Sequence, residues 1–297
     1  MVNSGNRGSV SSSVGGTPAP EPRQGMPSTG SPGLDWRTNF RPDIPSAARV
    51  YDYLLGGKDN YPVDRELARS MMAKLPNVRT AAQWNRAFLQ RVVRYLVGEI
   101  GIRQIIDIGA GLPSVGNTHE VAFDVARDAR VVYVDHDPVV LAHGRDMLQG
   151  IRNAVIIEHD LLEPEAILAD PVLTKLIDFS EPALLMFLGI LHFVSDDADP
   201  ADLITRLHAP FPSGSHVAIS HATSDATPEV RDVGRDFDRA TEQVHIRTRA
   251  EVLDLAAGLE PVPPGLVWLP EWRPDPGTDM PGNVTESYVC ALVATKP

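Results

Sequence analysis

The organisation of this chain follows from one short stretch, Gln104-Ile105-Ile106-Asp107-Ile108-Gly109-Ala110-Gly111. Its isoleucines are β-branched and closely spaced, as is typical of a short buried strand. Gly109 and Gly111 then allow the backbone to turn sharply and to approach a ligand that a side chain would obstruct. The stretch therefore predicts a strand followed by a glycine loop of the kind that binds nucleotide-type cofactors.

Two further apolar runs lead to acidic residues. Residues 131–134 precede Asp135, and residues 155–157 lie shortly before Asp160. In a parallel α/β sheet, ligands bind outside the carboxyl ends of the strands. We therefore expect Gly109, Asp135 and Asp160 to line one crevice, although each aspartate taken alone could equally cap a helix or a turn.

The composition narrows the class of protein. Of 297 residues, 43% are hydrophobic, which is enough for a substantial core. Lys and Arg number 27 against 39 Asp and Glu, and this formal charge of −12 argues against a nucleic-acid partner. No stretch approaches the roughly 20 apolar residues of a membrane-spanning helix. The single cysteine, Cys290, and the lack of a secretory signal pattern favour a cytoplasmic protein.

The chain divides into three predicted segments. Residues 1–34 are rich in Ser, Gly and Pro, and we expect a disordered tail. Residues 35–103 carry helical patterns and predict an N-terminal helical cap or lid. Residues 104–297 alternate between strand and helix patterns and predict the cofactor-binding domain, a doubly wound α/β fold with a mostly parallel sheet.

Local signals predict where the elements begin and end. Ser46 is placed to cap a helix over 47–55, which Gly56 would end. Further helices are expected at 65–74, 78–97, 118–128, 139–148, 200–208, 229–244 and 249–257. Later strands are expected at 183–188, 216–220, 265–269 and 288–293, the last two as an antiparallel pair. An apolar stripe at four-residue spacing is expected to face the core: Trp84, Phe88, Val92 and Leu96.

An aromatic and polar segment precedes the sheet domain. Tyr51, Tyr53, Asn60 and Tyr61 lie around two adjacent glycines. Ligand pockets combine apolar rings with a few polar groups, so these four residues are candidates for substrate binding. A packing helix followed by a turn is the alternative interpretation.

The glycine loop also indicates the type of cofactor. A dinucleotide-binding turn reads G-x-G-x-x-G, whereas Ser114 stands at the position of the third glycine. This weakens a pyrophosphate site. Asp107, Asp135 and Asp160 suit a cofactor that carries positive charge and no phosphate.

Several motifs in this order resemble those of class I S-adenosylmethionine-dependent methyltransferases. They are Asp107–Gly111, 134–138, 159–160 and 191–194 followed by Pro200 and Leu203, with 212–215 at the place of a K-P-G-G-like turn. Residues 44–61 resemble the N-terminal signature of a narrower bacterial family of S-adenosyl methyltransferases, formerly described as a domain of unknown function. The resemblance implies a Rossmann-like methyltransferase fold with a seven-stranded sheet.

The resemblance also implies roles for individual residues at the methionine end of the cofactor. Gly109 and Gly111 would approach the methionine moiety of S-adenosylmethionine, and Asp107 would support the loop or face the amino group. Pro113 departs from the family pattern, because it occupies the third glycine position of G-x-G-x-G.

At the adenosine end, the resemblance implies contacts with four residues. Asp135 would accept hydrogen bonds from the ribose hydroxyls, and His136 would flank the adenosine. Asp160, with Leu161, would face the edge of the adenine.

The resulting functional hypothesis is methyl transfer from S-adenosylmethionine to an unidentified small molecule. His192 follows the fourth predicted strand and is a candidate general base, or else a ring that shapes the pocket wall. The aspartates at 196, 197 and 199 fit a solvated loop better than a metal site. An NAD-type oxidoreductase and a catalytically silent S-adenosylmethionine-binding regulator are the alternatives.

Overall fold

The computed structural model describes Met1 and residues 41–237 and 240–297. The predicted tail, residues 1–34, lies outside this range apart from Met1. The chain divides into two units, Met1–Asp35 and Trp36–Pro297. All the described helices and strands belong to the second unit.

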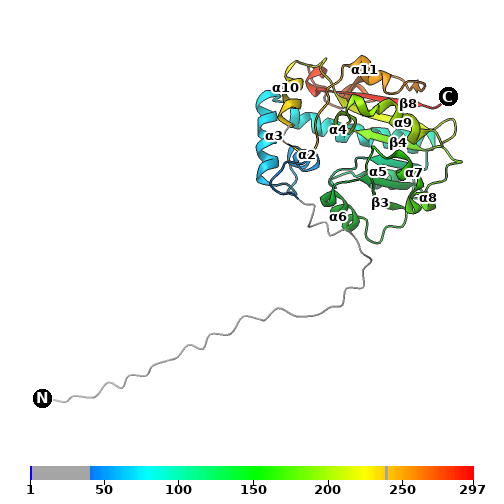
Figure 1. Ribbon diagram of the computed structural model, residues 1–297, viewed down its shortest axis with the longest axis horizontal. Helices are drawn as coiled ribbons and strands as arrows, with labels where there is room; N and C mark the ends of the chain where they lie inside the picture. Colours follow the sequence, from blue (N-terminus) through cyan, green and yellow to red (C-terminus); the bar gives the residue numbers. More distant parts are fainter. Residues whose placement is uncertain (2–40, 238–239) are drawn as a thin grey trace. The chain divides into compact units, whose positions relative to one another are not determined.

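An eight-stranded sheet forms the centre of this unit (Figure 1). Its strands are β1 (Gln104–Ile108), β2 (Arg130–Asp135), β3 (Ala154–Glu158), β4 (Leu184–Leu188), β5 (His216–Ala222), β6 (Glu260–Pro261), β7 (Val267–Trp268) and β8 (Val289–Thr295). The order is β3-β2-β1-β4-β5-β8-β6, and β7 also pairs with β8. Strands β1 to β5 are parallel and β8 runs antiparallel to β5, which confirms the predicted mostly parallel sheet with an antiparallel strand.

The strand count differs from the predicted seven. β6 and β7 are two residues long each, and both pair antiparallel with β8. β7 lies within the predicted strand 265–269, so β6 is the strand that was not predicted; its two residues show no alternation of polar and apolar side chains that a sequence pattern could reveal.

Helices connect the strands and precede them. They are α2 (Ala47–Leu55), α3 (Pro62–Lys74), α4 (Val78–Val93), α5 (Thr118–Val125), α6 (Pro138–Met147), α7 (Pro164–Ala169), α8 (Pro171–Leu176), α9 (Pro200–His208), α10 (Glu229–Asp236) and α11 (Arg249–Asp254). A π-helical segment, Arg94–Ile100, continues α4. Figure 1 shows α2, α3 and α10 gathered at one side of the sheet, where α10 packs against α3.

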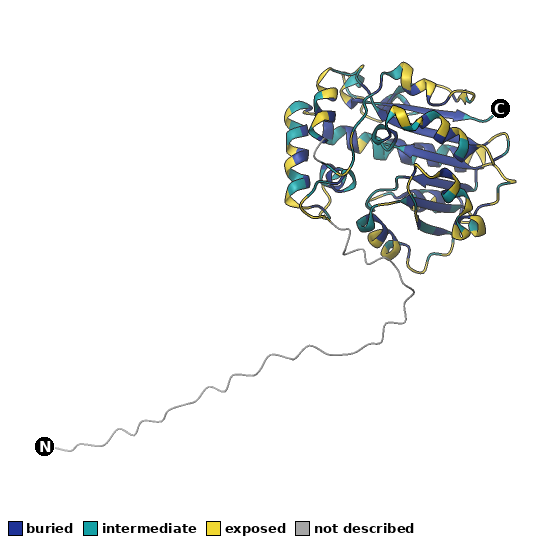
Figure 2. Cartoon of the chain, viewed as in Figure 1, coloured by how far each residue is buried: buried dark blue, intermediate teal, exposed yellow. Residues whose placement is uncertain are grey.

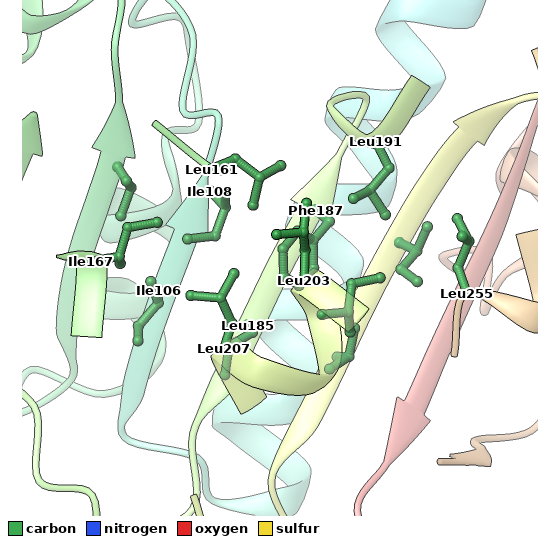
Figure 3. Close-up of a cluster of buried hydrophobic side chains, with 14 of the residues drawn as sticks. Ile106, Ile108, Leu161, Ile167, Leu185, Phe187, Leu191, Leu203, Leu207 and Leu255 are labelled. Carbon is green, nitrogen blue, oxygen red and sulfur yellow. The ribbon is translucent and has the colours of Figure 1, made fainter. Parts of the chain in front are cut away.

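Figure 2 shows that the central strands are mostly buried. Because side chains alternate along a strand, they form one hydrophobic cluster on each face of the sheet. Ile106 and Ile108 belong to one cluster, which α7, α9 and the segment after α11 cover (Figure 3). Ile105 belongs to the opposite cluster, which α4 and α5 cover. The predicted stripe, which runs along α4 and into the π-helical segment, packs in that second cluster, with Phe88 fully buried.

Several predicted boundaries agree with the structure, and others shift for local reasons. Gly56 ends α2 with a φ of +85°, as predicted. α3 begins at Pro62 rather than at 65, since proline suits the first turn of a helix. α10 ends at Asp236, short of the predicted 244. Ser46 precedes α2, but its hydroxyl donates to Asp137 Oδ2 at 3.0 Å instead of capping the helix.

Candidate active site

A cavity of about 530 Å³ lies at the carboxyl ends of the parallel strands. Gly109 after β1, Asp135 at the end of β2 and Asp160 after β3 all line it. Gly189 after β4 and Ser220 on β5 extend the same wall, and α2, α3, α4 and α10 supply the opposite one. The structure thus brings together the three residues that the strand pattern predicts to share a crevice.

Two glycines with left-handed backbone conformations shape the loop after β1. Gly109 has a φ of +70°, and a Cβ there would lie 2.6 Å from Ile190 Cδ1, so a larger residue would collide. Gly111 has a φ of +66°, and a Cβ there would meet nothing within 4 Å. The first glycine is therefore required by packing and the second by its backbone conformation.

Asp135 holds this loop against the end of β2. Its Oδ2 accepts a hydrogen bond from Gly111 N at 2.9 Å, and its Oδ1 accepts one from Asp137 N at 2.9 Å. Burial raises the pKa of Asp135, and these two backbone donors oppose the rise. Each carboxylate oxygen can accept a further hydrogen bond, so the side chain can also serve ligand hydroxyls.

Asp107 lies beneath the loop. It is buried, and its Oδ2 accepts a hydrogen bond from Thr118 Oγ1 at 2.6 Å. Burial raises the pKa of Asp107 to about 6, while the Thr118 hydroxyl and the charge of Arg86 oppose the rise. Arg86, on α4, lines the cavity and donates to Gly116 O at 3.0 Å, and its Nε has no hydrogen-bond partner among the described residues.

The three other predicted cofactor residues also line the cavity. His136 Nε2 lies 4.0 Å from Glu242 Oε1. Asp160 is exposed, and its Oδ1 accepts a hydrogen bond from Leu162 N. Leu161 is buried in the same cluster as Ile106 (Figure 3).

Of the four predicted substrate residues, Tyr51 lines the cavity. Tyr53 follows it by two positions, about 200° around the helix, and so points elsewhere. Its ring lies under the guanidinium groups of Arg69 and Arg79, with 5.9 and 5.5 Å between each Cζ and the ring centroid.

Asn60 and Tyr61 do not line the cavity either. The amide of Asn60 donates to Asp52 Oδ2 at 2.7 Å, so the loop after α2 closes on a carboxylate of α2 itself. Tyr61 is 38% exposed, and Arg49 Cζ lies 5.4 Å from its ring centroid. Their contacts support the turn from α2 to α3.

His192 faces the cavity from a short 3-10 turn, Leu191–Phe193, that follows β4. Its Nδ1 is buried and has no hydrogen-bond partner among the described residues. Burial, together with the neighbouring His221 and Arg247, keeps the pKa of His192 well below its usual value. The ring is therefore neutral over the physiological range.

Arg247 fixes the turn that carries His192. Its guanidinium donates to Leu191 O at 2.9 Å, to Val194 O at 2.8 Å and to Asp196 Oδ1 at 2.6 Å. Asp196 is thus engaged in an ion pair, and Asp199 caps α9 by accepting from Asp202 N. Within residues 41–237 and 240–297, no group of three or more His, Cys, Asp or Glu residues is arranged to hold a metal ion.

The sequence-based prediction missed Asn85 and Arg86 on α4. Both line the cavity, on the helix face that also presents Val78, Ala82 and Leu89. Two polar residues interrupt an otherwise apolar face at helical spacing, and that interruption is the signal that could have revealed them.

The sheet order, the glycine loop after β1 and the acidic residues after β2 and β3 define a methyltransferase that binds S-adenosylmethionine. The loop fits this cofactor, because it offers open space beside Gly111 and carboxylates without a phosphate cradle. The chain belongs to the S-adenosyl methyltransferase family, whose model matches residues 36–297. The oxidoreductase alternative is therefore set aside.

Two solved structures are similar over most of the chain. One is a candidate methyltransferase from Thermobifida fusca, which has 39% sequence identity and a TM-score of 0.81. The match covers 89% of this chain and 97% of that protein. The other is a DUF574 family protein from Streptomyces avermitilis, which has 38% sequence identity and a TM-score of 0.83. The match covers 86% of this chain and 100% of that protein. Among curated proteins, none matches the chain. In the described part of the chain, every helix is too short or too polar to cross a membrane.

Proposed function

We propose that this protein methylates a small molecule, bound between the sheet edge and the helices that precede it. The observation that carries this proposal is one continuous cavity, which joins the acidic strand ends to an apolar wall formed by α2, α3, α4 and α10. Residues 41–103, the described part of the predicted cap 35–103, then cover the acceptor, and residues 104–297 bind the cofactor. The one cysteine, buried Cys290, suits a reducing compartment and supports a cytoplasmic location.

The methionine end of the cofactor is assigned to the glycine loop. Gly109 and Gly111 allow its close approach, and the carboxylate of Asp107 attracts the positively charged amino group. Arg86 carries the opposite charge on the facing helix and suits the carboxylate of the methionine moiety. The sequence suggested the first three of these residues, and the structure adds the arginine.

The adenosine end is assigned to the ends of β2 and β3. Asp135 accepts hydrogen bonds from the ribose hydroxyls, His136 flanks the adenosine, and Asp160 with Leu161 borders the adenine. The start of α2 adjoins this end, because Ala47 N donates to Glu242 Oε2 at 3.1 Å while Glu242 lies near His136.

When bound, S-adenosylmethionine supplies a methyl group on a positively charged sulfur, which is already an activated leaving group. The task left to the chain is to align the acceptor and, where the acceptor must lose a proton, to receive it. His192 is proposed as the base, since its ring is neutral and faces the cavity.

The test uses methyl-labelled S-adenosylmethionine and a host extract divided by ultrafiltration into small molecules and macromolecules. We expect label in the small-molecule fraction with the wild type, and none with Asp135→Ala. Label confined to protein or nucleic acid would refute the small-molecule proposal. Cofactor binding by calorimetry with no transfer to either fraction would instead favour a silent regulator.

A further inference from the structure

The third hydrophobic cluster of this protein surrounds part of the cavity instead of filling it. It lies between α2, α3, the first half of α4, α10 and the start of β8. Of its buried residues, all except Leu67 and Ala68 line the cavity. We call the part of the cavity that they enclose the apolar chamber: Val50, Leu54, Met71, Leu75, Val78, Ala81, Ala82, Val230, Val233, Phe237 and Tyr288.

None of the described residues that form the chamber wall carries a charge. The acidic and basic side chains that line the rest of the cavity are Arg86, Asp107, Asp135, His136, Asp137, Asp160, His192 and Glu242. Most of these follow the strands, at the end of the cavity assigned to the cofactor. A charged group inside the chamber would lose its hydration without gaining a counter-ion.

Helix α4 connects the two ends of the cavity. Val78 and Ala82 line the chamber, and Asn85 and Arg86 follow one turn later on the same face. At a rise of 1.5 Å per residue, Val78 and Arg86 are about 12 Å apart along the helix axis. Asn85 therefore stands where the chamber meets the cofactor end.

The amide of Asn85 presents an acceptor oxygen. Tyr51 donates its only hydroxyl proton to Ala82 O at 3.1 Å, so its oxygen must accept the hydrogen bond from Asn85 Nδ2, also at 3.1 Å. This fixes the orientation of the amide. Asn85 Oδ1 is consequently left buried and without a partner among the described residues.

His192 lies close to this amide. A Cβ at Gly189 would be 3.6 Å from Asn85 Nδ2 and 3.9 Å from His192 Cε1, so the two side chains flank the same glycine after β4. Two hydrogen-bond acceptors, Asn85 Oδ1 and the unprotonated nitrogen of a neutral His192, thus border the inner end of the apolar chamber.

We infer that the methyl acceptor is an uncharged, mainly apolar small molecule that carries one hydroxyl group; this rests on the proposed function. Its apolar body fills the chamber, and its hydroxyl lies between Asn85 Oδ1 and His192, where its single proton can be donated to either acceptor. The hydroxyl oxygen forms the new bond to the methyl carbon as the bond from that carbon to sulfur breaks. The electron pair of the broken bond stays on sulfur, and the hydroxyl proton passes to His192.

The first experiment measures binding of three probes, which share a naphthalene ring and differ at one position, to the full chain saturated with S-adenosylhomocysteine. The probes are 2-naphthol, naphthalene and 2-naphthoate, and fluorescence or calorimetry reports the dissociation constants. We expect 2-naphthol to bind at least tenfold more tightly than either of the others. Equal or tighter binding of 2-naphthoate would overturn the inference.

The second experiment locates the probe. Val233→Trp fills the chamber from α10, whereas Arg235→Trp adds the same ring on the exposed face of that helix. We expect at least a tenfold loss of 2-naphthol affinity for the first variant and none for the second. Val233→Phe is a milder filling change, to be used if Val233→Trp does not fold. Unchanged 2-naphthol affinity in the folded filling variant would refute the chamber assignment.

The third experiment tests the hydroxyl contact. Asn85→Leu removes the unpaired oxygen, and Gln83→Leu is a matched change at an exposed position of α4. We expect the preference for 2-naphthol over naphthalene to fall at least fivefold in Asn85→Leu only. An unchanged preference would contradict the proposed contact.

These outcomes can be told apart from failure of the proposed function. Titration of each sample with S-adenosylhomocysteine reports on the cofactor site independently of the probes. If labelled methyl groups reach small molecules but the naphthol experiments fail, only the substrate class is wrong. If label reaches macromolecules alone, the small-molecule function itself is wrong.

Discussion

Asp107 combines burial with a position next to the expected cationic end of the cofactor. Its pKa of about 6 means that the free protein exchanges this proton between pH 5 and 7. A bound ammonium group would stabilise the carboxylate and lower that pKa, so cofactor binding would release a proton. Burial also raises the pKa of Asp135, which therefore contributes in the same direction.

We predict that S-adenosylhomocysteine binds more tightly as pH rises from 5 to 7, by about tenfold for a single linked proton. Below the pKa of the free carboxyl, binding must displace a proton and is weakened; above it, no proton remains to be displaced. Calorimetry in two buffers of different ionisation enthalpy measures the release directly. Asp107→Asn should flatten the dependence, and pH-independent binding by the wild type would exclude this role.

His192 is predicted to act at the chemical step and not in cofactor binding. His192→Ala should lower kcat toward a hydroxyl acceptor by about 10²–10⁴-fold, the usual contribution of a general base. Its affinity for S-adenosylhomocysteine should stay unchanged. Because its pKa is lowered, protonation of this ring should reduce the wild-type rate only well below pH 6.5. Initial rates across pH measure both effects, and an unaltered kcat would leave His192 as a wall residue.

At the scale of elements, one carboxylate joins the first two helices. Asp64 accepts from Arg49 Nε at 2.8 Å, from Ser46 N at 3.1 Å and from Tyr61 N at 2.8 Å. Arg49 and Asp64 are both buried, with side chains 3% and 0% exposed. The carboxylate thereby fixes where α2 and α3 begin, and with them one wall of the apolar chamber.

We predict that Asp64→Asn destabilises the fold by about 3–5 kcal/mol, because it removes the buried carboxylate that pairs with the Arg49 guanidinium. Urea unfolding followed by circular dichroism measures the change in free energy. Asp43→Asn breaks the exposed pair with Arg41 and serves as the control, for which we expect no measurable change. Equal stability of the two variants would show that the buried pair does not hold the helices.

Element positions were predictable from sequence wherever a local rule governs them. Gly56 ends α2 because its left-handed backbone favours glycine, and Pro138 begins α6 because the first turn tolerates proline. Side-chain direction was harder to predict. Tyr53 and Asn60 are near Tyr51 in sequence, but helix rotation and a loop that closes on Asp52 turn them away from the cavity.

Across the whole molecule, topology explains which part of the site could be predicted. The strand ends of a parallel sheet must converge, so Gly109, Asp135 and Asp160 were accessible to reasoning from sequence. Asn85 and Val233 line the cavity from helices that are separated by about half of the chain. Their approach depends on tertiary packing, which no local pattern records.

Ser46 connects the two ends of the cavity. Its backbone amide donates to Asp64, the carboxylate that fixes where α2 and α3 begin, and its hydroxyl donates to Asp137 beside Asp135. A change at one end can therefore reach the other. By thermodynamic linkage, any such effect is reciprocal. If bound cofactor raises the affinity for the acceptor by some factor, bound acceptor raises the affinity for the cofactor by the same factor. Where that coupling is favourable, the protein retains its methyl donor best when there is something to methylate.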